Sequence, residues 1–301
     1  MQILIRLRSL CDESALLTIV LHPMERMVHM HAIVCLKQVP DTAEVRIDPK
    51  TNTLIREGVP SIINPYDVHA LEEALRLKEQ NGGRVTVISM GPPQAAEALK
   101  KAISYGADRA ILLSDRKFGG ADTLATSYVI AKAIEKLVSQ DPPDIVFAGK
   151  QAIDGDTAQV GPGVATRLNY SLITYIEGIE DCNIGQGYVV AIRKIEGKKE
   201  YVKARLPAML TTLKGINEIR YATMPNMIRA ARYKPEVWGA SQLDDVEDDK
   251  LGLKGSPTWV SKSFTPPPMV RAKGEILTGT AAEIASKLVD KLVPVIIVPN
   301  K

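Results

Sequence analysis

The stretch DIVFAGKQAIDGDTAQVGP, from Asp144 to Pro162, places an apolar run directly before a polar loop and a predicted helix. A short apolar run without polar alternation is typical of a strand buried on both faces of a parallel sheet. Gly149 lets the chain turn sharply out of the strand, and Gly155 gives the loop a second point of conformational freedom. The stretch therefore predicts a strand, a polar loop and a helix in one α/β unit.

The same alternation recurs along the preceding sequence. Strands are predicted at 31–39, 84–91 and 108–115, and helices at 64–81, 95–105 and 121–140. In the first of these helices Asn64 is the expected N-cap, Pro65 the first helical residue and Gly82 the stop. The order predicts an α/β fold with a doubly wound, mostly parallel sheet of the Rossmann-like, adenine-nucleotide-binding type.

The pattern changes after Asn169. Three segments, 171–182, 187–197 and 198–213, have the character of antiparallel strands joined by glycine-containing turns, which we expect to extend the same sheet. Residues 214–268 have no periodicity, and irregular segments of that length are usually functional or lie against another chain.

The last part of the chain predicts one amphipathic helix, at 280–292, and a final apolar strand, at 293–299. We therefore divide the chain into an N-terminal extension outside the core (1–29), an α/β domain (30–213) and a C-terminal region (214–301).

Composition narrows the classes of function. The chain has 301 residues, 45% of them hydrophobic, and a net charge of +3, which is too balanced for a nucleic-acid-binding groove. No apolar stretch approaches the ~20 residues of a membrane helix. The three cysteines are far apart and the histidines lack metal-ligand spacing, so we expect no metal site and no disulfide framework. A cytoplasmic protein, held at a membrane only by a partner, is the resulting prediction.

Ligands of open parallel sheets bind beyond the carboxyl ends of the strands, where the strand order reverses. Four segments follow the predicted strands and converge there: 35–38, 90–92, 115–127 and 149–161. We place a nucleotide in the crevice between them.

The segment GGADTLATS, residues 119–127, has features of a phosphate site. Gly120 permits close backbone approach, Asp122 or Thr123 begins a helix, and Thr126 and Ser127 add hydroxyls to its first turn. The alternative is that Asp122 is only an N-cap and the glycines only a tight turn, and on this segment alone it is the stronger interpretation.

In the loop 149–161, Asp154, Asp156, Thr157 and Gln159 offer groups suited to ribose hydroxyls and an adenine edge. Neither a Walker motif nor GxGxxG is present, so this is not an ordinary P-loop or dinucleotide fingerprint. The alternative is a solvated polar loop.

With these residues the sequence closely resembles the beta subunit of electron transfer flavoproteins, from about His31 to the C-terminal helix. The resemblance rests on CLKQVPD, NPYDVHALEEALRLKE, ISMGPPQAAEALKKAISYGADRAILL, GKQAIDGDTAQVGP and LPAMLTTLKGINEIRYATMPNMIRAA. It implies a heterodimer with an alpha subunit, and nucleotide contacts at Cys35, Asn64, Pro65, Tyr66, Asp67, Met90, and within the loop Gly149, Lys150, Gln151, Ala152, Asp154, Gly155, Asp156, Thr157 and Gln159.

The nucleotide in that family is either AMP or a second FAD. DRKFGGADTLATSYVIAKAI, residues 115–134, and Gly155 resemble the two-FAD branch, which implies hydride transfer from NADH and electron bifurcation to a high-potential acceptor and to a ferredoxin-like carrier. One alternative is structural AMP in a carrier that shuttles electrons between dehydrogenases and a quinone oxidoreductase. Another is a nucleotide-dependent sensor without flavin. No catalytic side chain is expected.

The resemblance also implies a recognition loop, residues 213–231, that docks onto partner dehydrogenases. Its expected docking residues are Met224, Pro225, Met227 and Arg229. The alternative is a surface linker whose methionines are incidental. The C-terminal arm is expected to contact the alpha subunit.

Overall fold

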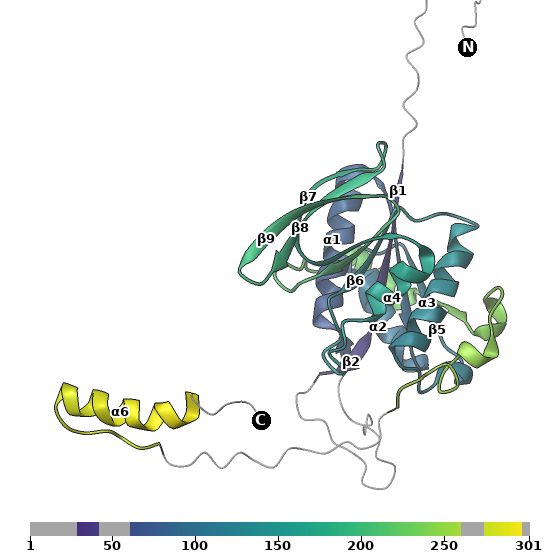
Figure 1. Ribbon diagram of the computed structural model, residues 1–301. Coiled ribbons are helices and arrows are strands. Elements are labelled where there is room, and N and C mark those ends of the chain that lie inside the picture. Colours follow the sequence, from purple (N-terminus) through teal and green to yellow (C-terminus); the bar gives the residue numbers. More distant parts are fainter. Residues whose placement is uncertain (1–28, 42–60, 260–273, 297–301) are drawn as a thin grey trace, which may run out of the picture. The chain divides into compact units, whose positions relative to one another are not determined.

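The computed structural model describes residues 29–41, 61–259 and 274–296 (Figure 1). The chain forms two compact units, and the described residues of the first are 29–41 and 61–259, while those of the second are 274–296. The expected N-terminal extension lies outside the described residues, except for His29.

A nine-stranded sheet organises the described part of the first unit (Figure 1). Its spatial order is β11 (Glu236–Trp238), β5 (Arg109–Leu113), β4 (Gly83–Met90), β1 (Met30–Leu36), β6 (Ile145–Gly149), β10 (Ala208–Thr212), β7 (Ser171–Asn183), β8 (Tyr188–Ile195) and β9 (Lys198–Arg205). All neighbours from β11 to β7 are parallel, and β7, β8 and β9 are antiparallel. The predicted fold class is confirmed. A short ladder of β2 (Gln38–Pro40) and β3 (Ser61–Ile63) stands apart.

Helices cover both faces of the parallel strands. One hydrophobic cluster joins the sheet to α1 (Pro65–Asn81) and α2 (Ala96–Tyr105), and a second joins it to α3 (Thr123–Val138) and α4 (Val160–Leu168). The described residues of this unit also form four single-turn helices: η1 (Pro93–Ala95), η2 (Arg116–Phe118), η3 (Ala240–Gln242) and η4 (Asp248–Lys250).

Strand β6 shows how the two clusters arise from one sequence. Phe147 packs into the cluster of α1 and α2, whereas Val146 and Ala148 pack into that of α3 and α4. Successive side chains of a strand point to opposite faces, so a continuous apolar run serves both layers. Complete burial of a side chain such as Phe147 stabilises the fold by roughly 2–3 kcal/mol.

Residues 198–213 differ from the sequence expectation. They form two strands: β9 is antiparallel at the sheet edge, but β10 is parallel and lies between β6 and β7. The prediction of one antiparallel addition was wrong for residues 208–212, because local composition does not reveal which distant strands a segment joins. All five residues of β10 are buried, as an interior position requires.

The segment predicted as irregular contains two regular elements. Helix α5 (Met224–Arg232) packs against α2, and β11 adds a parallel edge strand beside β5. The sheet therefore continues past the domain boundary expected at residue 213.

Helix α6 (Ala281–Ile296) is the described element of the second unit. It begins with a reciprocal pair of hydrogen bonds, from the Thr280 amide to Glu283 Oε2 at 2.8 Å and from the Glu283 amide to Thr280 Oγ1 at 3.5 Å. The helix predicted at 280–292 is confirmed. The final strand predicted at 293–299 is wrong for residues 293–296, because α6 continues through Pro294 to Ile296. Residues 297–299 of that prediction lie outside the described residues.

Candidate nucleotide site

The strand order reverses between β1 and β6. The chain passes from β1 to β4 and β5 on one side, while β6, β10 and β7 lie on the other. Lys37 follows β1 directly and Gly149 ends β6, so both lie at the carboxyl edge where such sheets bind ligands. This is the point at which the sequence predicts the nucleotide crevice.

Asp67, in the first turn of α1, braces the two strand ends. Its carboxylate accepts hydrogen bonds from the Lys37 amide at 2.7 Å and from the Gly149 amide at 3.0 Å. Burial raises the pKa of Asp67 to about 7, and hydrogen bonds from Asn64 and the two amides oppose that rise. Both carboxylate oxygens are therefore engaged in holding the crevice floor.

Gly149 is required by close packing. A Cβ at this position would collide with the carboxylate of Asp67 and would lie 2.5 Å from Tyr66 Cβ. Only glycine lets the end of β6 approach the start of α1 this closely.

Asn64 connects α1 to the loop 149–161. Its side chain donates to the Gln151 carbonyl at 2.8 Å and accepts from the Ile153 amide at 3.2 Å. It makes no side-chain cap bond to α1, so the predicted capping function of this residue is wrong although its position is right. The competing partner is the loop backbone, which is distant in sequence.

Charged and polar pairs shape the rest of this loop. Lys37 Nζ lies 2.7 Å from the Asp154 carboxylate, and Gln151 Nε2 donates to Asp156 Oδ1 at 2.6 Å. Asp156 and Ala158 have left-handed backbone conformations, with φ of 50° and 54°. Such conformations are uncommon outside glycine and are concentrated at functional loops.

The loop leaves open space at its tip. A Cβ on Gly155 would have no heavy atom within 4 Å, and Asp156 and Thr157 are exposed beside it. Packing within the described residues therefore does not explain the glycine at position 155.

Asp122 begins α3 as predicted. Its carboxylate accepts from the amides of Leu124 at 2.9 Å and Ala125 at 3.1 Å. Next to it, Thr123 Oγ1 donates to Gln159 Oε1 at 3.1 Å, so the starts of α3 and α4 are joined by a hydrogen bond. The two predicted helix starts are therefore neighbours, as a shared binding site would require.

A segment missed by sequence reasoning covers the start of α3. We call residues 252–258 the strap. Ser256 Oγ accepts from the Asp122 amide at 2.8 Å, and Thr258 Oγ1 donates to Asp122 Oδ2 at 2.8 Å. Leu253 fills the space where a side chain on Gly120 would lie. No motif marks the strap, because its partners lie about 130 residues earlier.

The remaining predicted contacts divide into two groups. Cys35 and Met90 pack on the sheet face covered by α3 and α4, near the crevice. Burial raises the pKa of the Cys35 thiol to about 12, so it stays protonated at neutral pH. Ser127, by contrast, is buried; its hydroxyl donates to the Leu124 carbonyl and accepts from Arg167 Nε of α4.

Two lysines at the crevice rim lie over aromatic rings. Lys150 Nζ is 5.2 Å from the ring centroid of Tyr175, and Lys214 Nζ is 4.8 Å from that of Tyr66. These cation–π contacts hold positive charge near the carboxyl ends of β6 and β10.

The donor set suits a nucleotide. Hydroxyls of Thr123 and Thr126, the carboxamide of Gln159 and nearby lysine charge match phosphate and ribose chemistry. The Asp122 carboxylate, however, already satisfies two amides of the α3 start, so this helix offers a phosphate its hydroxyls more than its amides.

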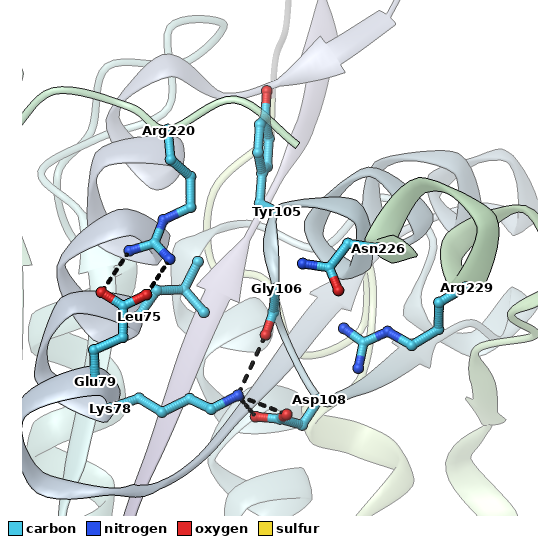
Figure 2. Close-up of a pocket in the computed structure, with 9 residues that line it drawn as sticks. All are labelled: Leu75, Lys78, Glu79, Tyr105, Gly106, Asp108, Arg220, Asn226 and Arg229. Atoms are coloured by element: carbon cyan, nitrogen blue, oxygen red, sulfur yellow. Dashed lines mark hydrogen bonds and ion pairs between the residues drawn. The ribbon is translucent and has the colours of Figure 1, made fainter. Parts of the chain in front are cut away.

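A separate cavity of about 220 Å³ lies between α1, α2 and α5 (Figure 2). Arg220 spans one side of it and pairs with Glu79, while Lys78 pairs with Asp108 at 2.7 Å. It adjoins the carboxyl ends of α1 and α2, and none of its lining residues belongs to the crevice.

Helix α5 carries the expected docking residues. Met224 is 68% exposed and Met227 50% exposed. Arg229, by contrast, donates from one guanidinium nitrogen to the carbonyls of Ile103 at 3.2 Å and Ala107 at 2.7 Å. It thereby fastens α5 to the end of α2.

None of the helices in the described ranges has the length and apolar character needed to cross a membrane. In the same ranges no group of three or more His, Cys, Asp or Glu side chains is arranged to hold a metal ion.

Comparison with known proteins identifies the family. Residues 51–243 match the electron transfer flavoprotein domain. The chain is 53% identical to "Protein FixA" of Azotobacter vinelandii over 79% of this chain and 85% of the relative. It is also 53% identical to "Electron transfer flavoprotein subunit beta" of Clostridium acetobutylicum over 87% of this chain and 98% of the relative. The resemblance found in the sequence is confirmed: this chain belongs to the electron transfer flavoprotein family, as a beta subunit.

Proposed function

We propose that this electron transfer flavoprotein beta subunit binds FAD in the crevice between β1 and β6 and is part of an NADH-oxidising, electron-bifurcating complex. The chemistry supplied by a bound FAD would be hydride uptake from NADH and release of single electrons, one through the alpha-subunit FAD to a high-potential acceptor and one to a low-potential carrier such as ferredoxin.

The hydrogen bond between Thr123 and Gln159 carries this proposal. It brings the starts of α3 and α4 to one side of the crevice, where two neighbouring phosphates can both be bound. A dinucleotide needs such a pair of sites, and a monophosphate needs one.

Several polar side chains near these helix starts bond to the surrounding backbone and side chains, and so hold the predicted site in shape. Asp67 fastens the two strand ends, Asn64 holds the loop at Gln151 and Ile153, and Lys37 secures Asp154. A site built on such bonds is preorganised, so less conformational freedom is lost when a nucleotide binds.

The second candidate is a non-bifurcating carrier with structural AMP. The open space at Gly155 favours the larger ligand, because neighbouring groups leave room at the tip of the loop. The engaged Asp122 carboxylate favours AMP, since it adds negative charge where a further phosphate would lie.

Cofactor counting decides between these candidates. The chain is purified with its alpha subunit and denatured, and the released flavin and adenine nucleotides are quantified. Two FAD per heterodimer is the expected result, and one FAD with one AMP would refute bifurcation. Thr123→Val with Gln159→Ala should lower the content toward one FAD, while Thr166→Val, which removes an exposed hydroxyl of α4, should leave it unchanged.

The partners follow from the same proposal. We expect a heterodimer with an alpha subunit, contacted by the C-terminal arm, whose helix α6 exposes Leu288, Val289 and Leu292 within its own unit. We expect dehydrogenase or quinone oxidoreductase partners at the recognition loop. A cytoplasmic complex would then reach a membrane only through such a partner.

A further inference from the structure

The hairpin of β8 and β9 carries an unusual share of the charge. Residues 188–205 contain six basic and two acidic side chains, a net charge of +4, while the whole chain has a net charge of +3. The remaining sequence is therefore slightly acidic. A charge concentrated in this way in one hairpin sets up a local positive field on an otherwise balanced molecule.

Four of the six cations lie on one face of the hairpin. Val202 and Ala204 pack toward the core, so the alternate residues of β9 point away from it. Together with Lys194 of β8, these outward residues form what we call the basic stripe: Lys194, Lys199, Lys203 and Arg205. All four are exposed, and Tyr201 between them is 66% exposed.

Part of the stripe destabilises the hairpin. Lys194 and Lys199 are directly opposite each other across the strands, and like charges in that position are destabilising. Glu177 pairs with Lys199, but Lys194 has no ion-pair partner among the described residues. Lysine on an edge strand discourages aggregation, yet Lys194 belongs to β8, which is not the edge.

Aromatic contacts hold part of the stripe in place. Lys203 Nζ lies 3.6 Å from the ring centroid of Tyr188, whose hydroxyl donates to Asp181 at 2.7 Å. A cation held over a ring that is itself fixed loses less freedom when a partner binds.

One end of the stripe, at Lys194 and Lys199, reaches the sheet edge at which the nucleotide site is predicted. A single hydrogen-bonded row runs from Gly149 through Thr212, Ile176 and Arg193 to Glu200. Four strand spacings correspond to about 20 Å measured along the sheet. A protein that contacts Lys194 and Lys199 would therefore lie at the sheet edge that holds the predicted nucleotide site. Lys203 and Arg205 extend toward the opposite edge, since only two residues separate Arg205 from Ala208 at the start of β10.

From these observations we propose that the basic stripe is a docking surface for a small acidic electron-carrier protein. Charge complementarity selects this partner: exposed lysines with a central tyrosine attract an acidic protein face and steer its approach. The inference requires that the chain act in an electron-transferring complex, but it does not depend on which nucleotide the crevice holds.

The test uses the intact heterodimer and a bacterial two-cluster [4Fe–4S] ferredoxin, chosen as an acidic carrier, with binding measured at 20, 50 and 200 mM NaCl. Lys194→Glu/Lys203→Glu should weaken binding at least tenfold at 50 mM NaCl and flatten the salt dependence. The variant should fold, because a carboxylate in place of the Lys194 ammonium attracts Lys199 across the strands where the native pair repels. Lys101→Glu/Lys254→Glu, with the same charge change at exposed sites elsewhere, should alter binding less than twofold.

Three results would overturn the proposal. The first is unchanged ferredoxin binding by the double variant. The second is loss of the alpha subunit from it, which would make the stripe a subunit interface. The third is equally tight binding of a 20-base-pair DNA duplex by the wild type, which would make it a general polyanion surface. Because binding is measured independently of flavin content, a cofactor count that refutes bifurcation leaves this test intact.

Discussion

The carboxylate of Asp67 occupies the space beside Gly149 that any other side chain would need. The same carboxylate accepts the Gly149 amide at 3.0 Å, so the end of β6 is fixed by a hydrogen bond and by steric exclusion together. Position 149 is therefore sensitive to a single added methyl group.

Gly149→Ala should destabilise the protein by about 1–3 kcal/mol, since the new methyl group must displace Asp67 or Tyr66. Urea unfolding of both proteins measures the difference. Gly155→Ala is the matched control, because its methyl group would enter open space, and a change within ~0.5 kcal/mol is expected. Equal stability of the two variants would contradict the packing described at the crevice floor.

Asp67 should also make the free energy of unfolding depend on pH. Its folded pKa of about 7 is above the ordinary value of 3.8, so its contribution to stability is complete below about pH 4 and is lost as pH rises toward 7. Asp67→Asn keeps one carbonyl acceptor, as protonated Asp67 does, and does not titrate. The free energy of unfolding of this variant relative to the wild type should therefore rise by about 2–4 kcal/mol between pH 4 and 7.5. A flat difference would show that the hydrogen bonds fully offset the effect of burial.

Arg220 should be essential for the attachment of the recognition loop. Its guanidinium donates to both oxygens of the buried Glu72 and to Glu79. Arg220→Ala leaves Glu72 without its countercharge and should cost about 3–5 kcal/mol in unfolding free energy. Arg76→Ala breaks the more exposed pair with Glu73 and should cost less than ~1 kcal/mol. Arg220→Lys should recover little, because lysine lacks the planar fork.

Asp122 should anchor the strap as well as cap α3. Asp122→Ala removes two cap bonds and the bonds to Thr258, with an expected loss of about 1–2 kcal/mol. Hydrogen exchange in residues 252–258 should accelerate at the same time. Thr258→Val keeps the cap, so it should accelerate exchange in the strap while leaving the first turn of α3 protected. Unchanged strap exchange in both variants would contradict the anchoring function.

The exposed methionines of α5 provide a test of docking. Met224→Ala removes an apolar side chain that is 68% exposed, so flavin content and thermal stability should stay the same while electron transfer to a partner dehydrogenase slows about tenfold. Leu253 is similarly exposed at 67%, but its side chain lies against Gly120 in the strap. Leu253→Ala should therefore reduce stability without slowing transfer. An unchanged electron-transfer rate in Met224→Ala would contradict a docking function of α5.

The parts of the fold that follow from local sequence were predictable. Apolar runs mark β1, β4, β5 and β6, and Pro65 and Asp122 mark helix starts, because these signals act within a few residues. The position of the candidate site was predicted from the rule that open parallel sheets bind ligands beyond the carboxyl ends of their strands. The position of strand β10 was not predictable in this way. It lies between β6 and β7, and its partner β6 is more than sixty residues earlier in the sequence.

The candidate site shows the same division. Sequence reasoning identified the loop 149–161 and the helix starts, because glycines and small polar residues mark them. It did not show that Asn64 bonds to the loop, that Ser127 faces α4, or that Thr258 reaches Asp122. Each depends on where a distant segment lies, and no local pattern encodes that.

The insertion of β10 between β6 and β7 has a consequence for synthesis of the chain. Until Thr212 has left the ribosome, β6 and β7 have no strand to join them, and the outer hairpin has no connection to the growing sheet. An N-terminal fragment that stops before Ala208 would thus expose unpaired strand edges on both sides of the missing element. Productive folding of this subunit must wait until roughly two thirds of the polypeptide has been translated.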